Sequence, residues 1–155
     1  MFNQDLEGSL PPEVVRYKNE LAQADGILIV TPEHDRSIPA VLKNAVDWGA
    51  RPYGQNSWAG KPAFITGTSP GAIGSAIAQQ HLRSVMVSLG VILMGGEAYV
   101  TFKPNLIDEH GNIAEREHAE IPARLRRSLR HAGRAPGAGG KALCGGVRKL
   151  VRHQR

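Results

Sequence analysis

The residues best placed to bind a ligand form a short polar loop, Pro32 to Arg36, which follows an apolar run at residues 26–30. The run is largely β-branched and does not alternate with polar residues, a pattern typical of a strand covered on both faces of a parallel sheet. In such sheets, ligands bind at the carboxyl ends of the strands, where unpaired N–H groups of the following helix favour an anion or an electron-rich ring. A polar loop at this place more often only connects its neighbours, so the pattern alone permits a ligand without requiring one.

A second loop, residues 68–74, is rich in glycine and serine and follows another apolar run at residues 62–67. Glycine is needed where a main chain comes close to a flat ligand or takes a positive φ, although short glycine loops also form plain turns. Because parallel strands end at the same edge of a sheet, two such loops on adjacent strands support each other as one site.

Side-chain catalysis is not predicted. Glu33, His34 and Asp35 are successive loop residues whose side chains do not converge easily, so we predict no metal site. Cys144 is the only cysteine and has no partner for a disulfide or a metal. His81 lies in an apolar helical pattern and is predicted to be a packing or interface residue.

The predicted elements alternate between helices and strands. A helix over 12–24, with Val14, Tyr17 and Leu21 on one face, precedes the strand at 27–31. Ser37 is predicted to cap the next helix, whose packing face holds Ile38, Val41, Leu42, Ala45 and Trp48. This order predicts an α/β fold with a parallel sheet.

The second half of the pattern contains one long helix and an interrupted strand. The helix is predicted over 73–89, with a stripe formed by Ile73, Ile77, Val85 and Leu89 that also includes His81. Residues 91–94 and 97–101 are predicted to form the last strand, with a bulge or turn at Gly95-Gly96.

Composition and charge divide the chain of 155 residues into two parts. Residues 1–113 carry 8 basic and 11 acidic side chains and are predicted to form one domain, whereas residues 114–155 carry 11 and 3. We predict that this basic tail is poorly ordered. Three explanations compete for it: binding of nucleic acid or membrane through its charge, a functionless extension, and a shifted reading frame. We prefer the shifted reading frame. No apolar run is long enough to cross a membrane, and we expect a cytoplasmic protein.

The stretch T-P-E-H-D-R-S-I-P-A-V-L-K-N-A-V-D-W, at residues 31–48, closely resembles the NADPH-dependent FMN reductase family. This family includes quinone, chromate and azo-dye reductases, and its usual wording here is P-E-Y-N-x-S-x-P-x-x-L-K-N-A-x-D-W. The resemblance implies a flavodoxin-like three-layer α/β/α sheet. It also implies that the chain begins about a third of the way into the usual domain, without the strand and loop that hold the FMN phosphate.

The resemblance further implies bound FMN, reduction by NADPH or NADH, and a quinone, flavin, chromate or azo compound as the small-molecule electron acceptor. A homodimer is expected, whereas neither membrane nor nucleic-acid binding is. The residues that the resemblance assigns to the cofactor are Pro32, Glu33, His34, Asp35, Ser37, Thr68, Ser69 and Gly71.

Two departures from the family wording affect the first loop. His34 stands where the family has tyrosine, and Asp35 replaces asparagine, which places a carboxylate near a ring that becomes anionic when reduced. We expect weaker FMN binding and a lower reduction potential, unless Arg36 offsets the charge. The alternative function is a noncatalytic, truncated remnant that cannot bind FMN and acts as an interaction module or not at all.

Overall fold

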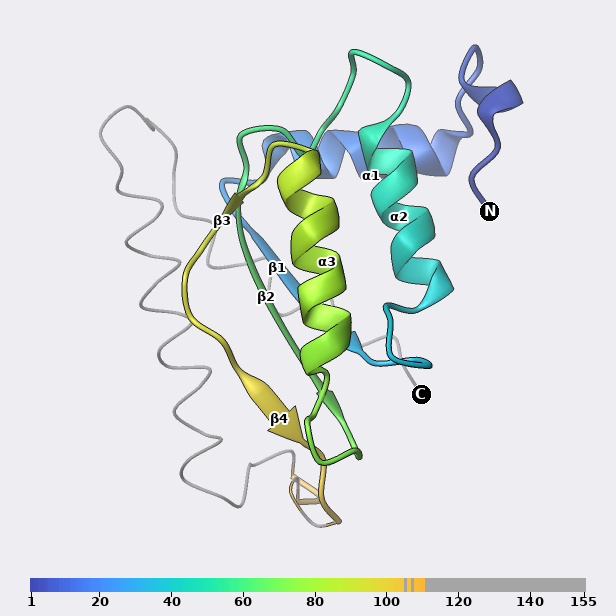
Figure 1. Ribbon diagram of the computed structural model, residues 1–155. Coiled ribbons are helices and arrows are strands. Elements are labelled where there is room, and N and C mark those ends of the chain that lie inside the picture. The colour runs from blue at the N-terminus through green and yellow to red at the C-terminus, as the bar shows by residue number, and fades with distance from the viewer. Residues whose placement is uncertain (105, 107, 111–155) are drawn as a thin grey trace.

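A parallel sheet forms the centre of the computed structural model, which describes residues 1–104, 106 and 108–110 (Figure 1). Strand β2 (Pro62–Ser69) lies between β1 (Ile27–Pro32) on one side and β3 (Ile92–Leu93) with β4 (Tyr99–Thr101) on the other. The register pairs Ile27 with Ala63 and Pro32 with Thr68, so β1 and β2 run side by side from start to end. Their carboxyl ends therefore meet at one edge of the sheet.

Three helices and the sheet share one hydrophobic core. A short 3-10 helix, η1 (Gln4–Leu6), precedes α1 (Pro12–Gln23), α2 (Ala40–Ala50) and α3 (Ala76–Ser88). The core joins side chains from α1, α2 and α3, from β1 and β2 and from two connections: Leu21, Ile29, Val46, Trp58, Ala63, Ile65, Leu82, Met86 and Val91. Because these strand residues point to one face, α1, α2 and α3 form a single helical layer on that face.

The two broken pieces of the last strand are both present, as predicted. β3 pairs with the start of β2 through Ala63 and Leu93, and β4 pairs with its end through Gly67 and Tyr99. Between them, the carbonyl of Ala98 accepts hydrogen bonds from the Thr66 hydroxyl and the Gln79 side-chain amide, at 3.1 and 2.9 Å. Side-chain hydrogen bonds thus take the place of backbone hydrogen bonds between strands where the last strand is interrupted.

Two predicted packing faces differ from the structure. In α2, Val41 is 73% exposed, although its spacing placed it on the packing face. In α3, the buried residues are Ala78, Gln79, Leu82 and Met86 rather than the predicted stripe. Gln79 explains the shift, because a polar residue was not expected to face the core, yet its side-chain amide binds two oxygens there.

Strand β1 also differs from the prediction that both of its faces are covered. Ile29 and Thr31 are buried on the helical side, whereas Val30 is 64% exposed on the opposite side. The predicted boundary at residue 113, the tail at 114–155 and its explanations lie outside the described residues. Within the described part of the chain, no helix is long and apolar enough to cross a membrane.

At the end of the sheet opposite the strand carboxyl ends, Lys18 and Lys61 bind main-chain carbonyls and Trp58 is buried. The ammonium of Lys18, only 9% exposed, donates to the carbonyls of Gly49, Arg51 and Gln55 at 3.2, 2.6 and 2.7 Å. Lys61 donates in the same way to the carbonyls of Ala22 and Ala24 at 2.6 and 2.8 Å. Both lysines therefore bind carbonyls at or just beyond the end of a helix, where the dipole is negative.

Candidate functional site

The first loop, Pro32 to Arg36, contains a tight two-residue turn that His34 and Ser37 close. The N–H of His34 donates to the carbonyl of Ser37 at 2.9 Å, and the N–H of Ser37 donates to the carbonyl of His34 at 2.8 Å. Between them, Asp35 and Arg36 have positive φ angles of 47° and 63°. In such a turn, the N–H groups of the two central residues take no part in the pair of hydrogen bonds that closes the turn. Neither group donates to a backbone carbonyl of the described residues, so both are available to a ligand.

The side chain of Glu33 points back into the protein and not toward a ligand. It is 5% exposed, and one of its oxygens accepts hydrogen bonds from the backbone N–H groups of Ile77 and Ala78, both at 3.1 Å. These amides belong to the first turn of α3. The other oxygen binds the Arg36 guanidinium at 3.2 Å. Glu33 therefore joins the first loop to the helix that follows the second.

The second loop, residues 68–74, is packed tightly against β4. The N–H of Gly71 donates to the Ser69 hydroxyl at 3.2 Å, and Gly74 donates to the carbonyl of Gly71 at 2.9 Å. A Cβ at Gly74 would lie 2.9 Å from the Val100 carbonyl oxygen, and φ there is +58°, so the position requires glycine. The hydroxyl of Thr68 donates to the same carbonyl at 2.8 Å. Gly71 itself is exposed at the tip.

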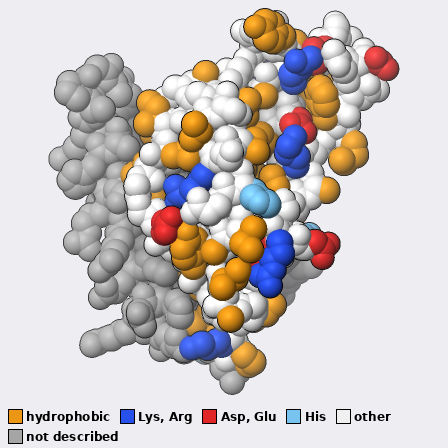
Figure 2. All heavy atoms as spheres, in the orientation of Figure 1, with side chains coloured by type: hydrophobic (Ala, Val, Ile, Leu, Met, Phe, Trp, Pro, Cys, Tyr) orange, Lys and Arg blue, Asp and Glu red, His pale blue; other side chains and the backbone are white. Residues whose placement is uncertain are grey.

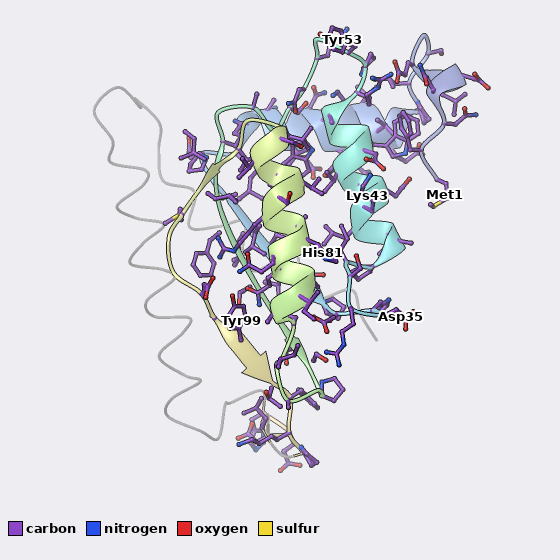
Figure 3. All side chains as sticks on the ribbon, in the orientation of Figure 1. Met1, Asp35, Lys43, Tyr53, His81 and Tyr99 are labelled. Atoms are coloured by element: carbon purple, nitrogen blue, oxygen red, sulfur yellow. The ribbon has the colours of Figure 1, made fainter. Side chains whose placement is uncertain are left out.

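Ser37 does not cap α2, contrary to the prediction. The helix begins at Ala40 with Pro39 at its N-cap and no side-chain cap bond. Ser37 instead closes the turn with His34. Its hydroxyl lies 3.2 Å from Nδ1 of His81, an exposed residue of α3. Figure 3 shows His81 on the outer side of α3 and Asp35 at the rim of the molecule. His81 is thus a surface contact of the first loop and not a core residue.

All eight predicted cofactor residues lie at the strand carboxyl ends or in the loops that follow. Pro32 and Thr68 face each other across the last register pair of β1 and β2. His34 and Asp35 are exposed in the first loop and Gly71 is exposed in the second, whereas Ser69 is half-buried. Sequence reasoning missed the amides of Ile77 and Ala78, since nothing local indicates which carboxylate binds them. It allowed Arg36 to offset the charge of Asp35, whereas the structure shows the Arg36 guanidinium bound to Glu33.

Comparison with known proteins agrees with this geometry. The model of the NADPH-dependent FMN reductase family matches residues 1–104. The chain belongs to this family. A solved member, the flavoenzyme NAD(P)H:(acceptor) oxidoreductase FerB from Paracoccus denitrificans, is 40% identical with a TM-score of 0.75, over 80% of this chain and 69% of that one. The predicted flavodoxin-like α/β class is thereby confirmed.

Two curated members of the FMN reductase family extend the comparison. A 2-hydroxy-1,4-benzoquinone reductase from a Burkholderia species is 49% identical over 118 residues, covering 76% of this chain and 64% of its own length. A quinone reductase from Pseudomonas putida is 42% identical over 125 residues, covering 79% of this chain and 67% of its own length. The chain thus spans about two thirds of the length of these relatives.

Proposed function

We propose that the protein is an NAD(P)H-dependent oxidoreductase that holds FMN at the carboxyl ends of β1 and β2 and reduces a quinone. The observation that carries the proposal is the turn at Asp35-Arg36, whose two N–H groups have no backbone partner among the described residues. Family membership supports the same conclusion, because members are named for FMN, nicotinamide and quinones. The second loop lies beside the turn, because Pro32 and Thr68, which begin the two loops, are register partners at the ends of β1 and β2.

The donors present fit the ring system of FMN. Its pyrimidine edge offers acceptor atoms, and the N–H groups of Asp35 and Arg36 are matching donors. Main-chain groups of residues 32–35 would line the ring, while Ser69 and Gly71 approach its polar edge and Ser37 and Thr68 support the two loops. When bound, FMN supplies hydride transfer between NADPH or NADH and the acceptor, so that no acid, base or nucleophile is needed from the chain.

The carboxylate of Asp35 is expected to weaken this site. Asp35 is exposed, and the guanidinium of Arg36 binds Glu33 instead of neutralising it. An unpaired negative charge beside the ring opposes reduction to an anion, which lowers the reduction potential. We therefore propose weaker FMN binding than in relatives with asparagine at this position.

A quinone is the proposed acceptor because relatives that are 49% and 42% identical are named as quinone reductases. Flavin, chromate and azo compounds remain secondary candidates by family resemblance.

We also propose a homo-oligomer in the cytoplasm, where nicotinamide cofactors are available. Exposed apolar side chains on the helical layer, such as Val41 and Val87, support the oligomer, and Figure 2 shows several hydrophobic side chains on the surface of the face that it draws.

An absorbance spectrum of the purified protein, before and after FMN addition and desalting, tests this proposal. We expect a bound flavin spectrum that bleaches with NADPH or NADH and recovers when 1,4-benzoquinone is added. Asp35→Asn should tighten FMN binding about threefold or more, since a charge near the ring is removed. Asp25→Asn, at the opposite end of β1, is the matched control and should change nothing. A protein that stays colourless after FMN addition overturns the proposal and favours the noncatalytic alternative.

A further inference from the structure

The first turn of α3 is capped from another element and not by its own sequence. Ser75, the N-cap residue, makes no side-chain cap bond, because its fully buried hydroxyl accepts from the Gln79 amide at 2.9 Å. The N–H groups of Ile77 and Ala78 instead donate to Glu33, which lies 44 and 45 residues earlier in the chain. A carboxylate at this position is favoured by the helix dipole and by charge-assisted hydrogen bonds.

The same carboxylate also supports the turn from the inside. Arg36 sits at φ 63°, a left-handed conformation that costs a residue with a side chain roughly 1 kcal/mol. Its guanidinium turns back to bind Glu33 at 3.2 Å while the rest of the side chain is exposed. Glu33 is therefore held by two amides of α3 and one guanidinium of the turn.

We propose that Glu33 is a positioning residue that couples the two loops of the site. With its carboxylate fixed on α3, the His34–Ser37 turn keeps the orientation in which the N–H groups of Asp35 and Arg36 face the ligand. The negative charge of Glu33 is compensated inside the protein, so the loop presents amides to the ligand there instead of a carboxylate. The effect on FMN rests on the function proposed above, whereas the coupling of the loops is a property of the chain itself.

Hydrogen exchange in the flavin-free protein tests the coupling directly. The N–H groups of His34 and Ser37 report on the turn, and those of Ile77 and Ala78 report on the helix, because each makes one of the bonds described. Glu33→Ala should accelerate exchange at all four positions by about fivefold or more, the size expected for a lost helix cap. Arg36→Ala should accelerate exchange in the turn alone.

Two further variants separate coupling from general instability. Glu33→Gln keeps an acceptor for the amides of α3 but loses the ion pair, so it should restore slow exchange at Ile77 and Ala78 and only partly at Ser37. Glu97→Gln is the matched control, because Glu97 is an exposed acid that binds Gln80 of α3 without capping the helix. It should leave all four positions unchanged.

Titration with FMN completes the test. Glu33→Ala should weaken FMN binding about tenfold, which corresponds to roughly 1.4 kcal/mol. Glu33→Gln should weaken it less. Accelerated exchange at Ile77 and Ala78 with an unchanged turn would overturn the coupling and leave Glu33 as a helix cap only. Failure of the wild-type protein to bind FMN would overturn the proposed function, while the exchange data would still decide the coupling.

Discussion

The two ends of the sheet are both fastened by charged side chains at helix termini, but with opposite signs and different results. At one end, Lys18 and Lys61 bind carbonyls near the ends of α2 and α1. At the other, Glu33 binds amides at the start of α3. The lysines donate to main-chain carbonyls that lie at or just beyond the ends of these helices, in segments that pack onto the core. Glu33 caps α3 from 44 and 45 residues earlier in the chain, and the turn beside it keeps two N–H groups without a backbone partner among the described residues.

The difference separates an end of the helical layer that is packed and buried from the end where we propose that FMN binds. Trp58 is buried at the lysine end, and its indole N–H donates to the carbonyl of Val46 at 3.0 Å. Asp35, Arg36 and Gly71 are exposed at the Glu33 end. Substitutions at the lysine end should therefore lower the free energy of unfolding without changing the site, whereas those at Glu33 should change the site as well as remove the cap of α3.

The largest expected effect comes from Gly49→Ala. The added methyl would overlap the indole of Trp58 and lie 3.1 Å from a methyl of Leu21. Overpacking of this kind should cost about 3 kcal/mol in the free energy of unfolding, measured by urea denaturation. Gly8→Ala is the control, because a methyl there meets nothing within 4 Å. Unchanged stability of Gly49→Ala would mean that Trp58 does not hold this end.

Lys18→Met should have the next largest effect. Methionine keeps the apolar stem but leaves three carbonyls without their shared donor, which should cost about 2 kcal/mol. Lys43→Met is the control: its exposed pair with Asp47, at 2.6 Å, is worth less than about 0.5 kcal/mol. Exchange at His34 and Ser37 should be unaffected in both variants. Faster exchange there at full occupancy of the folded state would contradict the separation of the two ends.

The smallest effect is a pH dependence at Tyr17, which packs edge-on against Trp58 with ring centroids 6.4 Å apart. Burial raises the pKa of Tyr17 above its ordinary value of 10.0. The unfolded chain therefore loses the phenol proton first, and the stability that this group contributes is complete below pH 10 and falls as the pH rises above it. Between pH 10 and pH 11, wild type should lose about 1 kcal/mol relative to Tyr17→Phe. Parallel stability curves for the two proteins above pH 10 would show that the phenol is not buried.

Much of the fold could be predicted, because apolar runs and helical spacing are local signals. Residues 12–24 and 27–31 gave α1 and β1 within one residue at their ends. The capping partners were not predictable in this way. Lys18 reads as a polar residue of α1, and only its tertiary surroundings show that it binds carbonyls beyond α2.

The candidate site was predicted at its correct place but not in its internal bonding. The carboxyl ends of neighbouring parallel strands must meet, so the order of elements brought the two loops together. The turn itself was not foreseen, since neither Asp35 nor Arg36 is a glycine and both have positive φ. The role of each predicted cofactor residue remains a prediction for the FMN titration.

The interruption between β3 and β4 has a consequence for insertions and deletions. Leu93 and Tyr99 are six residues apart, whereas their partners on β2, Ala63 and Gly67, are four apart. The surplus is an even number, so the side chains of β4 keep the facing that an unbroken strand would give them. Removing both Gly95 and Gly96 would preserve this parity, while removing one of them would turn Tyr99, Val100 and Thr101 to the wrong faces.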